Sequence, residues 1–365
     1  MAEATRVRAG KLFMVGVPGP ALDRATRSFL KGHSVGGVIL FRRNVAELGT
    51  LVALTAELHA LLPDQQILVA IDHEGGRVSR LGDPFTQFPP AAVLGRAKSP
   101  HLAYRQGIAM GEELRSVGID IDFAPVLDVA SNANNPVIGD RSFGAHPRTV
   151  SRLGISVVHG LQRTGVVPVG KHFPGHGDTD VDSHLDLPVV RRSMAELDRV
   201  ELFPFRRAIQ SGIEALMTAH VVFTALDPER PATLSRAILT DVLRERLRFR
   251  GVLFSDDLEM NAIRDRFAPD DAAVLAMEAG VDWLLACQNL DFAEQAIVGL
   301  ARAATRRPRL AARMEEAAAR TDALRRNHLR RLRRPYAYPP IPAGGLANHR
   351  DLVKWIEDRA AQAQS

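Results

Sequence analysis

The segment KHFPGHGDTDVDSHLDLP, residues 171–188, concentrates side chains that can carry or transfer protons. Within it lie three imidazoles, one ammonium and four carboxylates: His172, His176, His184, Lys171, Asp178, Asp180, Asp182 and Asp186. Glycines and prolines are interspersed, which favours a loop over a regular element. Three interpretations compete for this segment: a metal site, an acid/base site, or a solvated polar loop.

Two metal-binding patterns can be tested against the segment. A calcium loop that began at Asp178 would need glycine at its sixth position and glutamate at its twelfth, but the chain has Ser183 and Val189 there. His172 and His176 have the spacing of a helical zinc pair, but a proline and a glycine between them break any helix. Neither pattern fits, so a metal site is the less favoured interpretation of the segment.

Acid/base chemistry fits the segment better. Asp182 and His184 are two residues apart, so in an extended loop their side chains point the same way. The carboxylate would orient the imidazole and support its charge, and the other ring nitrogen would hand a proton to a leaving group. A pair that only stabilises the loop is the structural alternative.

Eight short apolar runs, each followed by a longer amphipathic segment, organise most of the chain. Their near-continuous hydrophobicity is typical of parallel strands buried on both faces. The runs are 11–17, 36–41, 66–72, 119–126, 166–173, 213–221, 251–257 and 281–287. Helix-like stretches lie between them at 45–62, 101–114 and 148–164, and Ser193 with Glu196 forms a capping-box pattern. This alternation predicts an α/β fold, a single (β/α)₈ TIM barrel; an open doubly wound sheet is the alternative.

Five of these runs end in polar residues or lead into them. A barrel has its active site at these positions, the carboxyl ends of the strands. The polar residues are Asp72, then Asp128, Asn132, Asp140 and Arg141, then Lys171 and His172, then His220, and finally Asp256 and Asp257. We expect these groups to point at one mouth. Asp256 would face the barrel axis, and Asp257 would point back to the scaffold because adjacent strand residues face opposite ways. A fixed carboxylate opposite a proton donor suits displacement at an acetal carbon with retained stereochemistry.

Composition excludes several classes of protein. The 365 residues are 46% hydrophobic and 24% charged, as in a globular protein. The formal net charge is +5, and the excess of positive charge is concentrated in one stretch. Residues 301–334 hold twelve arginines against three acidic residues, +9, which leaves −4 for the remainder. We interpret this stretch as a solvated surface helix and expect no nucleic-acid partner. One cysteine, Cys287, permits no internal disulfide, and neither a signal peptide nor a membrane span is apparent. A cytoplasmic monomer is expected.

The C-terminal part differs from the rest in composition. After Arg334 the chain reads PYAYPPIPAGG, an irregular tether, and residues 347–362 have a helical pattern. We predict a catalytic barrel over residues 1–334. Residues 335–365 would form a proline-rich tether and a C-terminal helix packed on the barrel.

Several motifs taken together resemble glycoside hydrolase family 3, in its β-N-acetylglucosaminidase (β-N-acetylhexosaminidase, NagZ-type) branch. They are DHEGGRVSR, FAPVLDV, NNPVIGDRSFG, KHFPGHGDTDVDSH and FSDDLEM, in that order between about residues 11 and 290. The resemblance implies a barrel that needs no cofactor and acts on a small carbohydrate substrate. The sequence departs from the family pattern at His73, where many relatives carry glutamine.

Site residues carry over from the resemblance position by position. Asp256 matches the family nucleophile, and His184 with its partner Asp182 matches the acid/base dyad. The residues that match sugar-binding positions are Asp72, Arg80, Arg141, Lys171 and His172. No role follows for Asp178 or Asp180.

The resulting expectation is a retaining exo-β-N-acetylglucosaminidase that hydrolyses terminal β-linked GlcNAc, as in muropeptides during peptidoglycan recycling. A β-N-acetylglucosaminide phosphorylase is the first alternative, since a histidine acid/base does not repel phosphate. A metal-dependent amidohydrolase and a non-catalytic sugar-binding barrel are the others.

Overall fold

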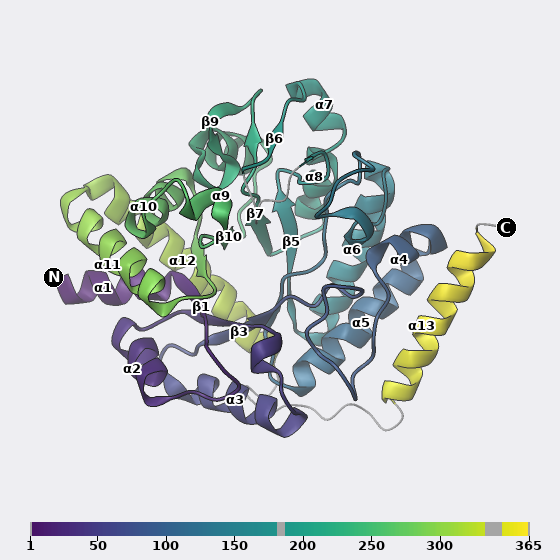
Figure 1. Ribbon diagram of the computed structural model, residues 1–365, viewed down its shortest axis with the longest axis horizontal. Coiled ribbons are helices and arrows are strands. Elements are labelled where there is room, and N and C mark those ends of the chain that lie inside the picture. The colour runs from purple at the N-terminus through teal and green to yellow at the C-terminus, as the bar shows by residue number, and fades with distance from the viewer. Residues whose placement is uncertain (1, 181–186, 333–344, 364–365) are drawn as a thin grey trace.

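The computed structural model describes residues 2–180, 187–332 and 345–363, and Figure 1 shows its elements in space. Asp182 and His184 therefore lie outside the described residues. The central element is a closed barrel of eight strands whose spatial order is β1-β11-β10-β7-β5-β4-β3-β2. The strands are β1 Phe13–Gly16, β2 Gly37–Leu40, β3 Leu68–Ile71, β4 Ile121–Asp122, β5 Val167–Phe173, β7 Ala215–Thr218, β10 Val252–Asp257 and β11 Trp283–Ala286.

All neighbouring strands in the barrel pair in parallel. Each strand lies inside one of the eight apolar runs, so the predicted (β/α)₈ barrel is confirmed. The fourth strand is only two residues long. Pro125, three residues further on, has no N–H to donate to a ladder.

Helices follow the strands and form the outer layer. They are α2 Arg24–His33, α3 Leu48–Leu61, α4 Ala91–Ala97, α5 Pro100–Ser116, α6 Pro147–Thr164, α7 Met194–Arg199, α8 Leu202–Gln210, a π-helix Ala237–Arg246, α9 Asn261–Arg264, α10 Pro269–Ala279 and α11 Leu290–Arg306. The predicted capping box is present, because Ser193 and Glu196 bond each other's backbone N–H at the start of α7. The stretch from 193 to 210 is nevertheless two helices, broken at Val200.

Two apolar cores stabilise the barrel. One lies between the strands and the surrounding helices. The other fills the barrel interior, where Phe254 stacks on Trp283 with ring centroids 5.2 Å apart and Phe123 packs edge-on against Phe254. The filled interior means that a ligand can bind only at an end of the barrel.

A small second sheet stands beside the barrel, where the chain leaves β5 and β7. Its order is β6-β8-β9, with β6 Val189–Val190, β8 Val222–Phe223 and β9 Asp227–Pro231. β6 pairs in parallel with β8, and β8 pairs antiparallel with β9. The sheet thus holds the chain immediately after residues 181–186.

The arginine-rich stretch is not a simple solvated helix. It forms the end of α11 and α12 Pro308–Arg331, and α12 runs across the N-terminal ends of the strands. Arg325 donates to the backbone oxygens of Gly36 and Gln66, just before β2 and β3, and Leu324 packs with the barrel interior. Exposed arginines such as Arg309 and Arg326 fit the predicted surface helix, but Arg325 is buried.

The chain ends are helical. α1 Ala2–Lys11 precedes β1 and packs on α11, whereas α13 Gly345–Gln362 lies against α4 and α5 at the edge of the molecule (Figure 1). Within the described ranges, no helix has the combination of length and apolar character that spanning a bilayer requires.

Candidate active site

A cavity of about 380 Å³ opens at the carboxyl ends of the barrel strands. Side chains that end the barrel's interior core form its floor: Ile39, Phe123, Met217 and Leu285. All six predicted site residues that the structure describes line this cavity: Asp72, Arg80, Arg141, Lys171, His172 and Asp256. The prediction that these strand ends meet at one mouth is therefore confirmed for these residues.

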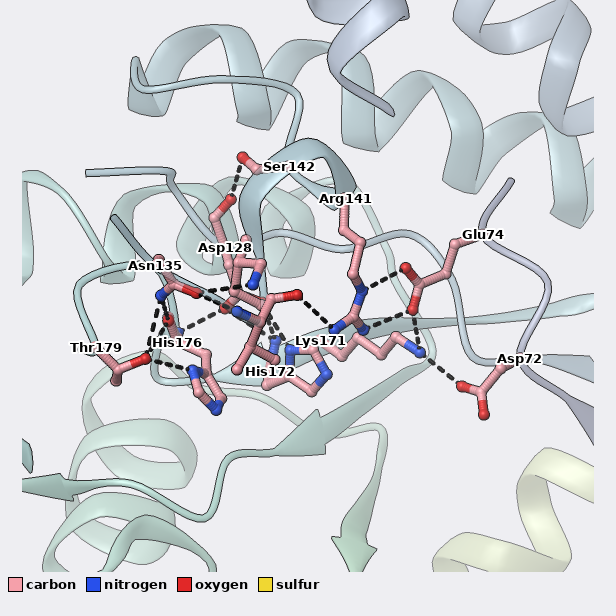
Figure 2. Close-up of polar contacts among 12 residues, drawn as sticks. Asp72, Glu74, Asp128, Asn135, Arg141, Ser142, Lys171, His172, His176 and Thr179 are labelled. Atoms are coloured by element: carbon pink, nitrogen blue, oxygen red, sulfur yellow. Dashed lines mark hydrogen bonds and ion pairs between the residues drawn. The ribbon is translucent and has the colours of Figure 1, made fainter. Parts of the chain in front are cut away.

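Lys171 is the centre of a buried ionic network, shown in Figure 2. Its Nζ lies 2.7 Å from Oδ1 of Asp72 and 2.7 Å from Oε1 of Glu74. Glu74 in turn accepts a bidentate pair of hydrogen bonds, both 2.8 Å long, from Nε and Nη2 of Arg141. Arg80 extends the network, with Nη2 3.5 Å from Oδ2 of Asp72.

The network keeps its members ionised despite their burial. Burial opposes the charge of Glu74, but Arg141 and Lys171 outweigh it and hold the pKa of Glu74 well below its usual range. Burial also opposes the charge of Lys171 and by itself would lower the pKa of this residue. The charges of Asp72 and Glu74 outweigh burial, so the pKa of Lys171 is raised. The cavity therefore presents fixed charges whose orientation is set before any ligand binds.

Glu74 is a site residue that the sequence analysis missed. It stands two residues after Asp72 in DHEGG, and that spacing places both side chains on one face of an extended segment. This spacing was the sequence signal for Glu74. In the structure its carboxylate is almost fully covered by Arg141 and Lys171, the two cations that it orients. His73, between them, has no exposed surface and is not part of the cavity wall.

His172 and His176 also line the cavity, and their rings pack edge to face with centroids 5.8 Å apart. Nδ1 of His172 lies 2.7 Å from Oδ2 of Asp128. Nδ1 of His176 lies 2.9 Å from Oγ1 of Thr179. Burial and the neighbouring His172 lower the pKa of His176 to about 4, so this ring is neutral at physiological pH.

Asp256 is the penultimate residue of β10 and reaches the cavity from the barrel wall. Its backbone N–H donates to Oγ1 of Thr218 at 3.3 Å. Its carboxylate oxygen Oδ1 accepts from the N–H of Asp257 at 2.8 Å. The side chain is thus fixed against the end of the strand that carries it.

Asp257 bonds the scaffold, as predicted, but it is also one of the residues that line the cavity. Its Oδ1 accepts from the backbone N–H groups of Glu259 and Cys287 at 3.1 and 3.2 Å. Burial, reinforced by the charge of Glu259, raises the pKa of Asp257 to about 7. The two adjacent aspartates therefore differ in orientation and in environment.

Four of the polar residues that follow strands do not face the cavity, which corrects the sequence-based expectation. His220 is fully buried, with Nδ1 2.8 Å from Oγ1 of Thr233 and Nε2 2.9 Å from the backbone oxygen of Asp257. Asp128 lies behind His172, Asn132 bonds the neighbouring loop, and Asp140 pairs with Arg77 near the surface. All four lie outside the strands, on the segments after β4 and β7, and none is in the cavity wall.

The predicted acid/base residues, Asp182 and His184, lie outside the described residues, and the structure describes the chain on both sides of their segment. Arg192 makes a bidentate ion pair with Asp178, with Nε and Nη2 at 2.7 and 2.6 Å. Nδ2 of Asn132 donates to Oδ1 of Asp180 at 2.6 Å. Asp178 and Asp180, which had no predicted role, therefore fix the chain next to the cavity.

Comparison with known proteins gives consistent results. The model of the glycosyl hydrolase family 3 N terminal domain matches residues 4–321. A β-hexosaminidase of Nitrosomonas eutropha is 41% identical over 293 residues, which is 79% of this chain and 83% of the relative. A β-hexosaminidase of Chromobacterium violaceum is 41% identical over 316 residues, 85% of this chain and 87% of the relative.

Two solved structures extend the comparison to three dimensions. A glycoside hydrolase family 3 β-N-acetylglucosaminidase from Paenibacillus sp. superposes with a TM-score of 0.90 at 37% identity, covering 97% of this chain and 68% of that one. NagZ from Neisseria gonorrhoeae, in complex with N-trifluoroacetyl-D-glucosamine, superposes with a TM-score of 0.76 at 33% identity, covering 95% of this chain and 98% of that one.

Proposed function

The chain belongs to glycoside hydrolase family 3, and from that premise we propose that it is a retaining exo-β-N-acetylglucosaminidase. The observation that carries the proposal is the position of Asp256. This carboxylate stands in the wall of the same cavity that holds every described residue matched to sugar binding. Relatives named β-hexosaminidase, and a structural neighbour that holds an N-acylated glucosamine, support GlcNAc as the sugar.

In the proposed mechanism Asp256 attacks the anomeric carbon and forms a covalent glycosyl ester, which water then hydrolyses. His184, oriented by Asp182, would protonate the leaving oxygen in the first step and activate water in the second. This dyad rests on the family resemblance. It is compatible with the described chain, because His176, a few residues earlier, lines the cavity.

The ionic network would recognise the hydroxyl groups of the sugar. The carboxylate of Asp72 can accept hydrogen bonds from hydroxyls, and Arg80, Arg141 and Lys171 can donate to them. The filled barrel interior closes the cavity from below. The exo mode of cleavage is proposed from the family resemblance.

We further propose GlcNAc-containing muropeptides as the natural substrates, hydrolysed in the cytoplasm during peptidoglycan recycling. The basis is the resemblance to the recycling branch of the family. A direct comparison of purified muropeptides with other β-GlcNAc glycosides checks this part separately from the reaction type.

The reaction is tested with a chromogenic β-GlcNAc glycoside beside the matching β-glucoside. We expect hydrolysis of the first with retained stereochemistry. Asp256→Asn should lower kcat by about 10⁴-fold or more, because an amide cannot form the ester. A fluorinated β-GlcNAc donor with an activated leaving group should label the peptide that contains Asp256, as seen by mass spectrometry.

Asp351→Asn is the matched control, since this exposed carboxylate pairs with Lys354 on α13 and neither residue is in the cavity wall. Its kcat/KM should stay within about twofold of the wild type. Labelling of a peptide without Asp256 would contradict the mechanism. Formation of GlcNAc 1-phosphate in place of GlcNAc when phosphate is added would show that the reaction is phosphorolysis and not hydrolysis.

A further inference from the structure

The cavity wall contains an aspartate–histidine pair other than the predicted dyad. Nδ1 of His172 lies 2.7 Å from Oδ2 of Asp128, as Figure 2 shows. His172 lines the cavity, whereas Asp128 has no exposed surface and is not among the lining residues. Asp128 thus contacts the ring from behind, and any effect that it has on a bound sugar must act through His172.

Asp128 is a carboxylate that can only accept hydrogen bonds. Burial raises the pKa of Asp128, but its interactions with His172 and His176, hydrogen bonds among them, outweigh burial and lower it. Its Oδ1 also accepts from the backbone N–H groups of His176 and His172, at 2.7 and 3.1 Å. Because the acceptor carries no proton, the proton between Asp128 and His172 must belong to Nδ1 of the ring.

The backbone holds both partners in place. The N–H of Leu127 donates to the backbone oxygen of Lys171 at 2.6 Å, and the N–H of Lys171 donates to that of Pro125 at 3.2 Å. The backbone oxygen of Asp128 accepts from Oγ of Ser142 at 2.7 Å. These backbone hydrogen bonds fix the positions of the two segments, so the side chains of Asp128 and His172 are held opposite each other.

We propose that Asp128 is a positioning residue that fixes His172 in the Nδ1-protonated form and directs Nε2 to the sugar. In the neutral ring Nε2 then accepts a hydrogen bond from a sugar hydroxyl. This step rests on the proposed function, because it takes a hydroxyl to be the partner of Nε2. The assignment of the ring proton does not depend on any ligand.

Asp128→Asn is the informative substitution because it keeps the shape. The amide oxygen can replace Oδ1 and accept from the two backbone N–H groups, which leaves the amide NH₂ facing Nδ1 of His172. An NH₂ group donates, so Nδ1 must lose its proton and Nε2 must gain it. The atom that faces the sugar changes from acceptor to donor while the fold is kept.

The tautomer is measured by ¹⁵N NMR of histidine-labelled protein at about pH 8, where free imidazole is neutral. His172→Gln identifies the signals of His172 by their loss. The wild type should show a protonated Nδ1 and an unprotonated Nε2, and Asp128→Asn should show the reverse. A wild-type ring protonated at Nε2 alone would overturn the proposal, and this measurement stands even if the variant fails to fold.

Kinetics supply the second readout. Loss of one hydrogen bond to a charged or polar group in the site should lower kcat/KM of Asp128→Asn by about 10- to 100-fold, mainly through KM. A folded variant within about twofold of the wild type would overturn the proposal. If the wild type hydrolyses no β-GlcNAc glycoside, the proposed function fails, whereas the tautomer result still decides the role of Asp128.

Asp122→Asn is the matched control. Asp122 is also fully buried and belongs to β4, and its Oδ1 accepts from the backbone N–H of His73 at 2.9 Å, a bond that an amide oxygen can keep. This variant should leave the tautomer of His172 unchanged and kcat/KM within about twofold. An equal loss of activity in both variants would point to a general effect of substituting a buried carboxyl group and would overturn the specific role of Asp128.

Discussion

At the scale of single residues, the site depends on groups that a sugar would scarcely touch. Glu74 is almost fully covered, yet it accepts from Arg141 and faces Lys171, two residues matched to sugar binding. Asp128 stands in the same relation to His172. In both cases a buried carboxylate determines where a cavity-lining group points, which is how a polar site keeps its geometry before it is filled.

Glu74→Gln should raise KM for the chromogenic β-GlcNAc glycoside by about tenfold with a smaller change in kcat. The amide cannot neutralise Lys171 and Arg141, and its NH₂ group would face a guanidinium donor, so both cations lose their fixed orientation. Steady-state kinetics with the folded variant checks this. An unchanged KM would show that Arg141 and Lys171 keep their positions without Glu74.

At the scale of elements, α12 closes the barrel at the end opposite the cavity. Asp282, just before β11, has no exposed surface and contacts Arg244, Arg313 and Arg320. Asp120, just before β4, accepts from Arg115 at 3.0 Å and lies 2.8 and 2.9 Å from Nε2 of His59 and His328. The buried carboxylate at the start of β11 therefore holds two arginines of α12, Arg313 and Arg320.

Asp282→Asn should destabilise the protein by about 3–5 kcal/mol, because it leaves buried guanidinium groups without their anion. The midpoint of urea unfolding, compared at equal m-values, measures the loss. Glu278→Gln is the control, since its ion pair with Arg307 is largely exposed and such pairs contribute about 0–1 kcal/mol. Equal losses in the two variants would show that the ion pairs of Asp282 contribute no more to stability than an exposed ion pair does.

At the scale of the whole molecule, α13 docks on the barrel through one buried histidine. Nδ1 of His349 lies 2.8 Å from Oε1 of Glu113, and Nε2 lies 3.1 Å from Oε2 of Glu112. Arg350 adds a hydrogen bond to the backbone oxygen of Pro84, and Arg105 lies over the ring of Trp355. The division into a barrel of residues 1–334 and a tether with a helix stays a prediction, as do the monomeric state and the lack of a nucleic-acid partner.

This contact makes the stability of α13 docking depend on pH. Burial lowers the pKa of His349, but the hydrogen bonds and charges of Glu113 and Glu112 reverse this and raise it. A raised pKa means that the charged ring stabilises the fold fully below its unfolded pKa of about 6.5, and that this contribution is lost as pH rises through the folded value. The difference in melting temperature between wild type and His349→Gln should therefore be larger at about pH 6 than at about pH 9.

His101→Gln is the control for this measurement, because His101 is an exposed histidine on α5. Its effect on the melting temperature should be small at both pH values. A His349→Gln effect that is the same at both pH values would show that the ring acts through packing and not through its charge.

The elements of this protein follow from local patterns in its sequence. The eight apolar runs define the eight strands, because strands buried on both faces need continuous hydrophobicity. The capping box at Ser193 and Glu196 marks a helix start because its two hydrogen bonds are made within four residues. The placement of Asp72, Lys171 and Asp256 at one mouth follows from the rule that active sites lie at the carboxyl ends of barrel strands.

Only the tertiary structure decided which polar groups face the cavity and which support it from behind. Asp256 and His172 belong to β10 and β5 and line the cavity, whereas His220 and Asp128 come after β7 and β4 and are fully buried outside its wall. The burial of Arg325 and the pairing of Glu74 with Arg141 likewise join residues far apart in the sequence. The periodicity of the sequence indicates on which face of a helix or strand a side chain lies. The residue that it contacts depends on which other element packs against that face.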